Sequence, residues 1–241
     1  MIDNEKNLLS IEKKVLDELE ENKERIPQFS RIPDRTSGFV IKSKQITELS
    51  LFNFSLTTLP ETIGNLSELR ILRIQRNRLQ TLPDSICSLT KLKELFLRWN
   101  QLAIIPDNIG NLRNLQKLYL WGNKLTSLPE SIGNLSKLKR LDLEDNQLKI
   151  LPKTIGQMEN LVYLNLTNNE IQQLPQSIWD LKNLKILSLA NNQLISLAND
   201  VGKLANLTKL WLDNNPIADS ESEKNRINQL VAENCKVRWK A

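Results

Sequence analysis

Leucine and isoleucine recur along most of this chain at a fixed spacing of 23 residues. Each unit continues with the pattern LxxLxLxxNxLxxLPxxIxxLxx, and no insertion or deletion interrupts it between residues 46 and 215. The units open at Ile46, Leu69, Leu92, Leu115, Leu138, Leu161, Leu184 and Leu207. Such a period, repeated in register, predicts a solenoid whose stacked units share one continuous core.

Each unit predicts two elements on opposite sides of the solenoid. The alternating apolar and polar residues at its start predict a half-buried strand, and strands repeated in one direction predict a parallel sheet. The LPxxI part contains a proline, which has no N–H group, so short 3₁₀ or helical turns are expected there. Their isoleucines are expected to point inward. Because this side is bulkier, the sheet is predicted to line the concave face of a horseshoe.

Asparagine follows the predicted strand in every unit but the first. These residues are Asn77, Asn100, Asn123, Asn146, Asn169, Asn192 and Asn215. We expect a structural role for this column, since a short amide can satisfy the backbone groups of neighbouring turns. The first unit has Phe54 at this position, which leaves the geometry of its turn open.

The pattern resembles the leucine-rich repeat family. It is most similar to the 23-residue subclass of Ras-associated and Scribble-type scaffold proteins and of many prokaryotic repeat proteins. The resemblance covers residues 46–215 of the 241. It implies an α/β solenoid with a parallel concave sheet and a convex side of short helical turns. It indicates the fold more specifically than the function, because one fold carries many functions.

Caps are expected at both ends, because a solenoid exposes apolar core there. Residues 5–24 predict an amphipathic helix. Its apolar positions are Leu8, Leu9, Ile11, Val15, Leu16 and Leu19. Pro27 and Pro33 predict an irregular connection, and residues 38–41 predict a strand that forms a hairpin with the first repeat strand through Ser43 and Lys44.

The C-terminal cap is predicted to contain a helix over residues 219–233 and a strand over 235–239. The helix should have Ser or Asp near its N-cap, with Ile227, Leu230 and Val231 facing inward. Cys235 and Trp239 are expected in the core of this cap. The predicted organisation is therefore an N-terminal cap (1–45), eight repeats (46–215) and a C-terminal cap (216–241), with no further catalytic domain.

The composition removes most catalytic chemistry. The chain contains no histidine, which excludes Ser-His-Asp and Cys-His systems and histidine-based metal sites. It has no GxxxxGK motif and no CxxC motif among its two cysteines, Cys87 and Cys235. We therefore predict no enzyme activity, no catalytic residue, no cofactor and no metal site. With no signal peptide pattern and no apolar run of about 20 residues, a cytoplasmic protein without a membrane segment is expected.

The outward positions of each strand, the third, fifth, seventh and eighth of the unit, hold the most informative residues. Seven of the twelve aromatic residues lie there: Phe52, Phe96, Trp99, Tyr119, Trp121, Tyr163 and Trp211. A sheet face without a partner has no reason to display them in water, and Trp, Tyr and Arg are enriched at interface hot spots. We therefore predict a protein partner on the concave face. The predicted binding residues are Ile71, Arg73, Arg76, Phe96, Arg98, Trp99, Tyr119, Trp121, Asp142, Glu144, Tyr163 and Trp211.

Other interpretations of this face stay open at the level of sequence. The aromatic residues can stabilise the sheet as cross-strand pairs, and the arginines can pair with neighbouring carboxylates such as Glu94. The basic and aromatic half could instead bind nucleic acid or a glycan, although Asp142, Glu144 and Asp145 interrupt the basic character. The resemblance to Ras-associated repeats suggests a small GTPase or a phosphatase as partner, but no residue of the face selects one.

Overall fold

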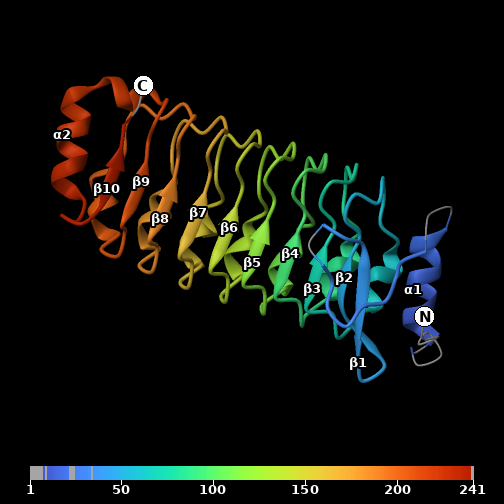
Figure 1. Cartoon of the computed structure of the whole chain (residues 1–241). Helices are drawn as coiled ribbons and strands as arrows, with labels where there is room; N and C mark the ends of the chain where they lie inside the picture. Colours follow the sequence, from blue (N-terminus) through green and yellow to red (C-terminus); the bar gives the residue numbers. More distant parts are fainter. Residues whose placement is uncertain (1–7, 9, 22–24, 34, 240–241) are drawn as a thin grey trace.

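The repeats stack into one open sheet of ten strands that follow each other in chain order (Figure 1). The computed structural model describes residues 8, 10–21, 25–33 and 35–239. All neighbouring strands are parallel except β1 and β2, which are antiparallel. The strands are β1 (Gly38–Lys42), β2 (Gln45–Ser50), β3 (Ile71–Arg73), β4 (Glu94–Phe96), β5 (Lys117–Tyr119), β6 (Arg140–Asp142), β7 (Tyr163–Asn165), β8 (Ile186–Ser188), β9 (Lys209–Trp211) and β10 (Lys236–Arg238).

Short 3₁₀ helices form the side opposite the sheet, as the LPxxI segments predict. They are η2 (Glu61–Asn65), η3 (Asp84–Ser88), η4 (Ile109–Asn111), η5 (Glu130–Asn134), η6 (Lys153–Gln157), η7 (Gln176–Asp180), η8 (Asn199–Lys203) and η9 (Pro216–Asp219). The isoleucines of the LPxxI segments are almost completely buried, and so are the leucines of the strands. One core therefore runs the length of the solenoid between the sheet and these helices.

The asparagine column joins each repeat to the one before it. In the fifth repeat, the Asn146 side chain donates to the carbonyls of Leu120 (3.1 Å) and Leu143 (3.0 Å), and its Oδ1 accepts from the N–H of Leu125 (3.0 Å). The other members of the column make the equivalent bonds, and all are at least 92% buried. The predicted structural role of the column is confirmed.

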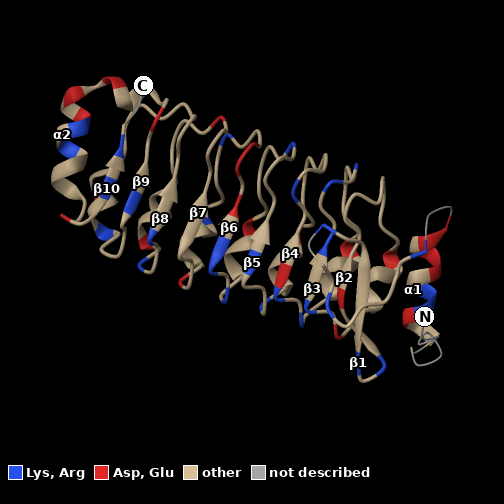
Figure 2. Cartoon of the chain, in the orientation of Figure 1, with Lys and Arg blue, Asp and Glu red and all other residues tan. Residues whose placement is uncertain are grey.

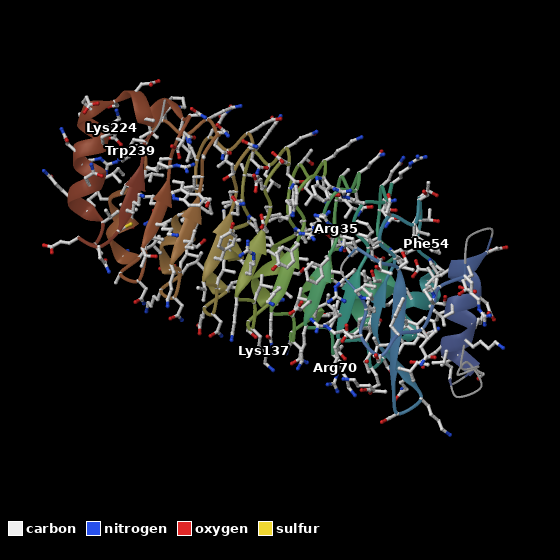
Figure 3. All side chains as sticks on the ribbon, viewed as in Figure 1. Arg35, Phe54, Arg70, Lys137, Lys224 and Trp239 are labelled. Atoms are coloured by element: carbon white, nitrogen blue, oxygen red, sulfur yellow. The ribbon has the colours of Figure 1, made fainter. Side chains whose placement is uncertain are left out.

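The first repeat keeps its turn although it lacks an asparagine. Asn77 of the second repeat accepts hydrogen bonds from the N–H groups of Phe54 and Leu56, both at 3.0 Å. The ring of Phe54, which is labelled in Figure 3, is half-buried and packs against the core. The turn is held from the following repeat, so phenylalanine can replace the asparagine here.

The N-terminal helix differs in part from its prediction. α1 spans Ser10–Glu20 and buries Val15, Leu16 and Leu19. Parts of the predicted range (residues 5–7, 9 and 22–24) lie outside the described residues. Ile11, predicted on the apolar face, is 46% exposed, because the buried stripe passes through Glu12 instead. One Glu12 carboxylate oxygen accepts from the N–H of Ile46 at 3.0 Å, so a carboxylate replaces the expected apolar contact.

The predicted hairpin is present, and the segment before it crosses the edge of the sheet. β1 and β2 turn at Ser43 and Lys44, as expected. The Oγ of Ser50, on the concave face, donates to the carbonyl of Thr36 at 2.7 Å, and the Oγ of Ser37 donates to the carbonyl of Phe52 at 3.0 Å. This segment therefore covers the first repeat, which the sequence patterns did not indicate.

The C-terminal cap follows its prediction with shorter elements. α2 spans Glu221–Leu230, and the Oγ of its N-cap residue Ser220 accepts from the N–H of Glu223. β10 adds to the sheet parallel to β9. Ile227 is buried, and Cys235 and Trp239 pack half-buried against the core, as expected. The domain boundaries at residues 46 and 216 stay a prediction.

Two residues replace the glycine that other repeats place inside the 3₁₀ turn. A Cβ at Gly133 would lie only 2.5 Å from the carbonyl of Thr154, so these glycines let successive turns approach closely. Cys87 and Trp179 occupy the same position and are 96% and 98% buried. Trp179 is thus part of the core.

Replacing Asn146 with Ala should lower the free energy of unfolding by about 2–4 kcal/mol, because buried N–H and C=O groups of two repeats lose their partners. Urea denaturation followed by circular dichroism measures this loss. The matched control is Asn160→Ala, which removes one exposed hydrogen bond to Ser136 and should cost at most about 1 kcal/mol. Equal losses in the two variants would contradict the role of the column.

Candidate protein-binding surface

Two pairs of aromatic rings form the centre of the concave face. Phe96 on β4 pairs in register with Tyr119 on β5, and their rings stack with centroids 4.7 Å apart and planes 9° apart. Beyond the carboxyl ends of the same strands, the rings of Trp99 and Trp121 lie 4.2 Å apart and tilted by 59°. Four of the seven aromatic residues predicted on outward positions are therefore brought together in space, and we call them the aromatic centre.

Arginine guanidinium groups lie over these rings. Arg76 lies 4.4 Å from the Trp99 ring and 5.8 Å from Phe52. Arg98 lies 5.9 Å from both Trp99 and Trp121. Such cation–π contacts are worth about 0.5–1 kcal/mol each at exposed sites. They hold the long arginine side chains in place, so that less conformational entropy is lost when a partner binds.

Arg73, at the N-terminal side of this centre, contacts one aromatic ring and one carboxylate. Its guanidinium lies 5.4 Å from the Phe96 ring and forms an ion pair with Glu48 at 3.4 Å. Ile71 is half-buried on the same strand. Glu94, considered above as an arginine partner, pairs instead with Lys117 at 2.9 Å. This hydrogen bond is the main cause of a raised pKa of the Lys117 ammonium group.

Arg140 is a central residue that the sequence patterns did not single out. It lies 3.6 Å from the ring of Tyr163 and 5.4 Å from that of Tyr119, and it pairs with Asp142 at 3.2 Å. It therefore connects Tyr163 to the aromatic centre. Its outward third position in the unit, between two tyrosine strands, was the signal that could have identified it.

The acidic residues of the fifth repeat make hydrogen bonds within the face. The side chain of Asn165 donates to Asp142 (3.1 Å) and to Glu144 (2.9 Å). Burial raises the pKa of Glu144, the bond from Asn165 partly offsets this, and the carboxylates of Asp142 and Asp145 raise it further. Figure 2 shows blue and red side by side on β6, where the basic and acidic parts of the face meet.

Trp211, by contrast, lies apart from the aromatic centre. β8 separates β9 from the tyrosine strand β7, and its outward residues include the buried Ser188. The Trp211 ring lies 4.8 Å from the guanidinium of Arg238 in β10, which pairs with Asp213 at 2.6 Å. Trp211 thus contacts the C-terminal cap, and the compact part of the predicted set spans β3 to β7.

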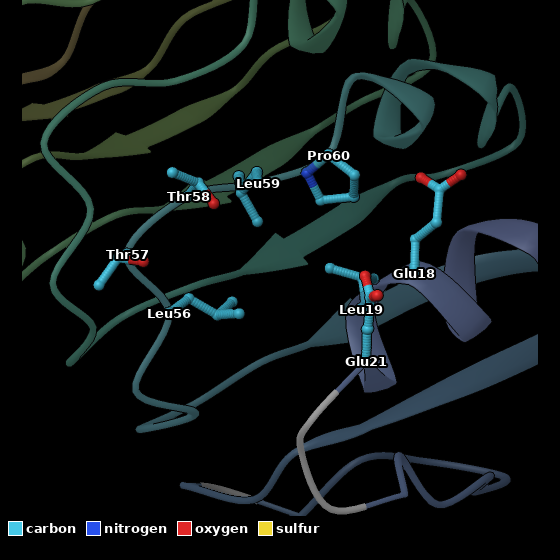
Figure 4. A pocket seen from close by; sticks show the side chains of 8 residues that line it. All are labelled: Glu18, Leu19, Glu21, Leu56, Thr57, Thr58, Leu59 and Pro60. Carbon is cyan, nitrogen blue, oxygen red and sulfur yellow. The ribbon is translucent and has the colours of Figure 1, made fainter.

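Other places in the fold offer little chemistry. A groove of about 380 Å³ lies between α1 and residues 56–60, with Glu18 and Glu21 at its rim (Figure 4). Burial, followed by the nearby charge of Asp84, raises the pKa of the Cys87 thiol to about 11, which disfavours the nucleophilic thiolate. In the described part of the chain, we find no cluster of three or more His, Cys, Asp or Glu residues able to hold a metal ion.

Sequence profiles and solved structures agree with this architecture. Profiles described as "Leucine-rich repeat region", "Leucine rich repeat" and "Leucine Rich repeats (2 copies)" match residues 37–127, 113–171 and 182–223. The chain is a leucine-rich repeat protein. No curated protein sequence matches it. Among the described residues, no helix is both long enough and apolar enough to cross a membrane.

Several bacterial and plant structures are similar to this leucine-rich repeat protein. The Leptospira interrogans protein LIC12759 is 34% identical (TM-score 0.60), with 84% of this chain and 60% of that chain covered. The Listeria monocytogenes internalin InlF is 26% identical (TM-score 0.61; 76% and 51% covered). The plant peptide hormone receptor RGFR1, in complex with RGF2, is 28% identical (TM-score 0.64; 76% and 30% covered). The chain thus spans 30–60% of the length of these relatives.

Replacing Glu144 with Gln should increase the free energy of unfolding at pH 7. The raised pKa means that ionised Glu144 costs stability above this pKa, and the cost is absent below the ordinary carboxyl pKa of about 4. An amide oxygen can still accept the bond from Asn165. The gain should therefore be present at pH 7 and disappear below about pH 4.

Urea titrations at both pH values measure this difference, with the exposed Glu159→Gln as control, for which a change within about 0.5 kcal/mol is expected. A gain that persists at low pH would show that the charge of Glu144 is not its cause.

Proposed function

We propose that this leucine-rich repeat protein is a non-enzymatic interaction module that binds a protein partner on its concave face. The binding residues are those of the predicted set, with Phe96, Trp99, Tyr119 and Trp121 as anchors. The observation that carries the proposal is the packing of Trp99 against Trp121 with Arg76 and Arg98 over their rings, while Trp99 stays 39% exposed. Trp, Tyr and Arg dominate the residues whose truncation weakens protein interfaces.

The rigidity of the surface supports this function. Each strand is fixed by its neighbours and by the asparagine column, and the aromatic side chains are held by stacking. A preformed surface limits the ordering cost of binding. The chain contains no histidine, and the cysteine in the core has a raised pKa, so the face is suited to binding rather than to proton transfer.

Similarity to other repeat proteins also supports binding of protein or peptide. The similar plant receptor was solved in complex with RGF2. A small GTPase or a phosphatase stays a partner class suggested by the resemblance to Ras-associated repeats. We also propose a cytoplasmic location, which is supported by the two unpaired cysteines.

The double variant Tyr119→Ala/Trp121→Ala should lose the partner while keeping its fold. Affinity capture from a lysate of the source cells, followed by a titration with the captured protein, should show a loss of at least about 30-fold in affinity, as expected for hot-spot residues worth about 2 kcal/mol. Circular dichroism verifies the fold.

The control is Lys153→Ala/Asp180→Ala, which removes two exposed side chains on η6 and η7. It should bind like the wild type. Capture that is unchanged in the concave-face variant, or lost equally in the control, would refute binding on the concave face.

A further inference from the structure

The eighth position of every repeat has a left-handed backbone. Its φ angle lies between 51° and 69° in all eight units. Gly, Asn and Asp tolerate this conformation, whereas for a bulky residue it is an outlier. The eight residues are Asn53, Arg76, Trp99, Gly122, Asp145, Asn168, Asn191 and Asn214. Six repeats therefore use a tolerant residue, and the second and third repeats do not.

These two exceptions contact each other. The guanidinium of Arg76 lies 4.4 Å from the Trp99 ring. In the next repeat, a Cβ at Gly122 would lie 2.8 Å from Cδ1 of Trp99, so the glycine leaves the space that the indole fills. The turn itself does not require Arg or Trp, because the other repeats form it without them. Strained backbone of this kind is retained mainly where the side chain serves function.

The charge of this cluster is not compensated within the fold. Arg76 and Arg98 lie on the Trp99 ring, and across the described chain neither forms an ion pair. The Nε of Arg98 is buried without a hydrogen-bond partner in the structure. Arg73 and Arg140, by comparison, pair with carboxylates of the same face.

The acidic residues of the fifth repeat all accept hydrogen bonds within the face, but only Asp142 forms an ion pair with another described residue. Asp142 pairs with Arg140, and Glu144 accepts from Asn165. Asp145 accepts from Asn168, the next residue of the eighth-position column. Among the described residues, the arginine charge without a carboxylate partner on this face is therefore concentrated around Trp99, whereas Glu144 and Asp145 keep negative charge two repeats further along.

We propose that the Arg76–Trp99–Arg98 cluster binds an acidic segment of a protein partner. Glu or Asp carboxylates of the segment accept hydrogen bonds from the two guanidinium groups, and its apolar side chains pack on the indoles of Trp99 and Trp121. A nucleic-acid strand fits less well, because its regular phosphates would meet Glu144 and Asp145 only two repeats further along. This inference rests on the proposed function and specifies the partner.

The eighth-position column offers variants that should not damage the fold. Arg76→Asn and Trp99→Asn introduce the residue that other repeats use at the same φ angle. Their urea unfolding midpoints should equal or exceed that of the wild type. The probe is a library of random 16-residue peptides, selected on the immobilised wild-type chain and depleted on the Arg76→Asn/Trp99→Asn variant.

Selected peptides should be enriched in Asp and Glu relative to the starting library. A synthetic copy of a selected peptide should quench the tryptophan fluorescence of the wild type. It should bind the Arg76→Asn/Trp99→Asn variant at least tenfold more weakly. Replacing its acidic residues with Asn and Gln should weaken binding to a similar extent. Both losses should shrink as salt is raised, because exposed charges are screened.

Three results would overturn the acidic-segment assignment. The first is that the selected peptides are no richer in Asp and Glu than the library. The second is that they bind the Arg76→Asn/Trp99→Asn variant as tightly as the wild type. The third is that an oligothymidylate of 16 nucleotides binds more tightly than any peptide. If peptides lacking acidic residues bind and the Tyr119→Ala/Trp121→Ala variant abolishes that binding, the proposed function stands and only this inference fails. If neither variant affects any captured protein, the proposed function fails as well.

Discussion

The hydrogen bonds of the buried asparagine column are the constraint on which the rest of this structure depends. The chain leaves each three-residue strand by a sharp turn, and the backbone groups inside that turn have no strand partner. The amide of Asn146, for example, satisfies a carbonyl of its own repeat together with a carbonyl and an N–H of the preceding one. Leucine side chains supply the burial, and the asparagines satisfy the buried backbone groups that would otherwise have no partner.

Because leucine, isoleucine, proline and asparagine occupy the structural positions, the outward strand positions are free to vary. Along the concave face they change from arginines and aromatic rings near β3 to β5, through the mixed charges of β6, to the uncharged Ile186 and Ser188 on β8. A single scaffold therefore presents surfaces of different chemistry side by side. Arg140 lies at the junction, with a tyrosine on either side and Asp142 paired to its guanidinium.

The period in the sequence predicted the fold because a strict repeat assigns an environment to every position at once. It predicted the parallel sheet, the 3₁₀ turns, the asparagine column and the aromatic residues on the outward strand positions. The caps were less predictable, since they depend on contacts between distant segments, such as the bond from Ile46 to Glu12 that leaves Ile11 exposed. The left-handed backbone of the eighth position could be inferred from the Asn, Asp and Gly residues of that column. The strain that it imposes on Arg76 and Trp99 could be recognised only from the backbone angles.

The direction of the asparagine bonds makes the two ends of the solenoid unequal. Each asparagine serves the repeat before it, as Asn77 does for Phe54 and Asn215 does for Leu194. Shortening the array from its C-terminal end would orphan buried N–H groups in the last repeat that is left. Shortening it from the other end would leave the asparagine-bound N–H groups supplied, but it would remove other acceptors, such as the carbonyls of Thr47 and Leu56 that accept from Arg70 and Arg78. The two ends of the array therefore leave different groups without partners, and the two caps are not interchangeable.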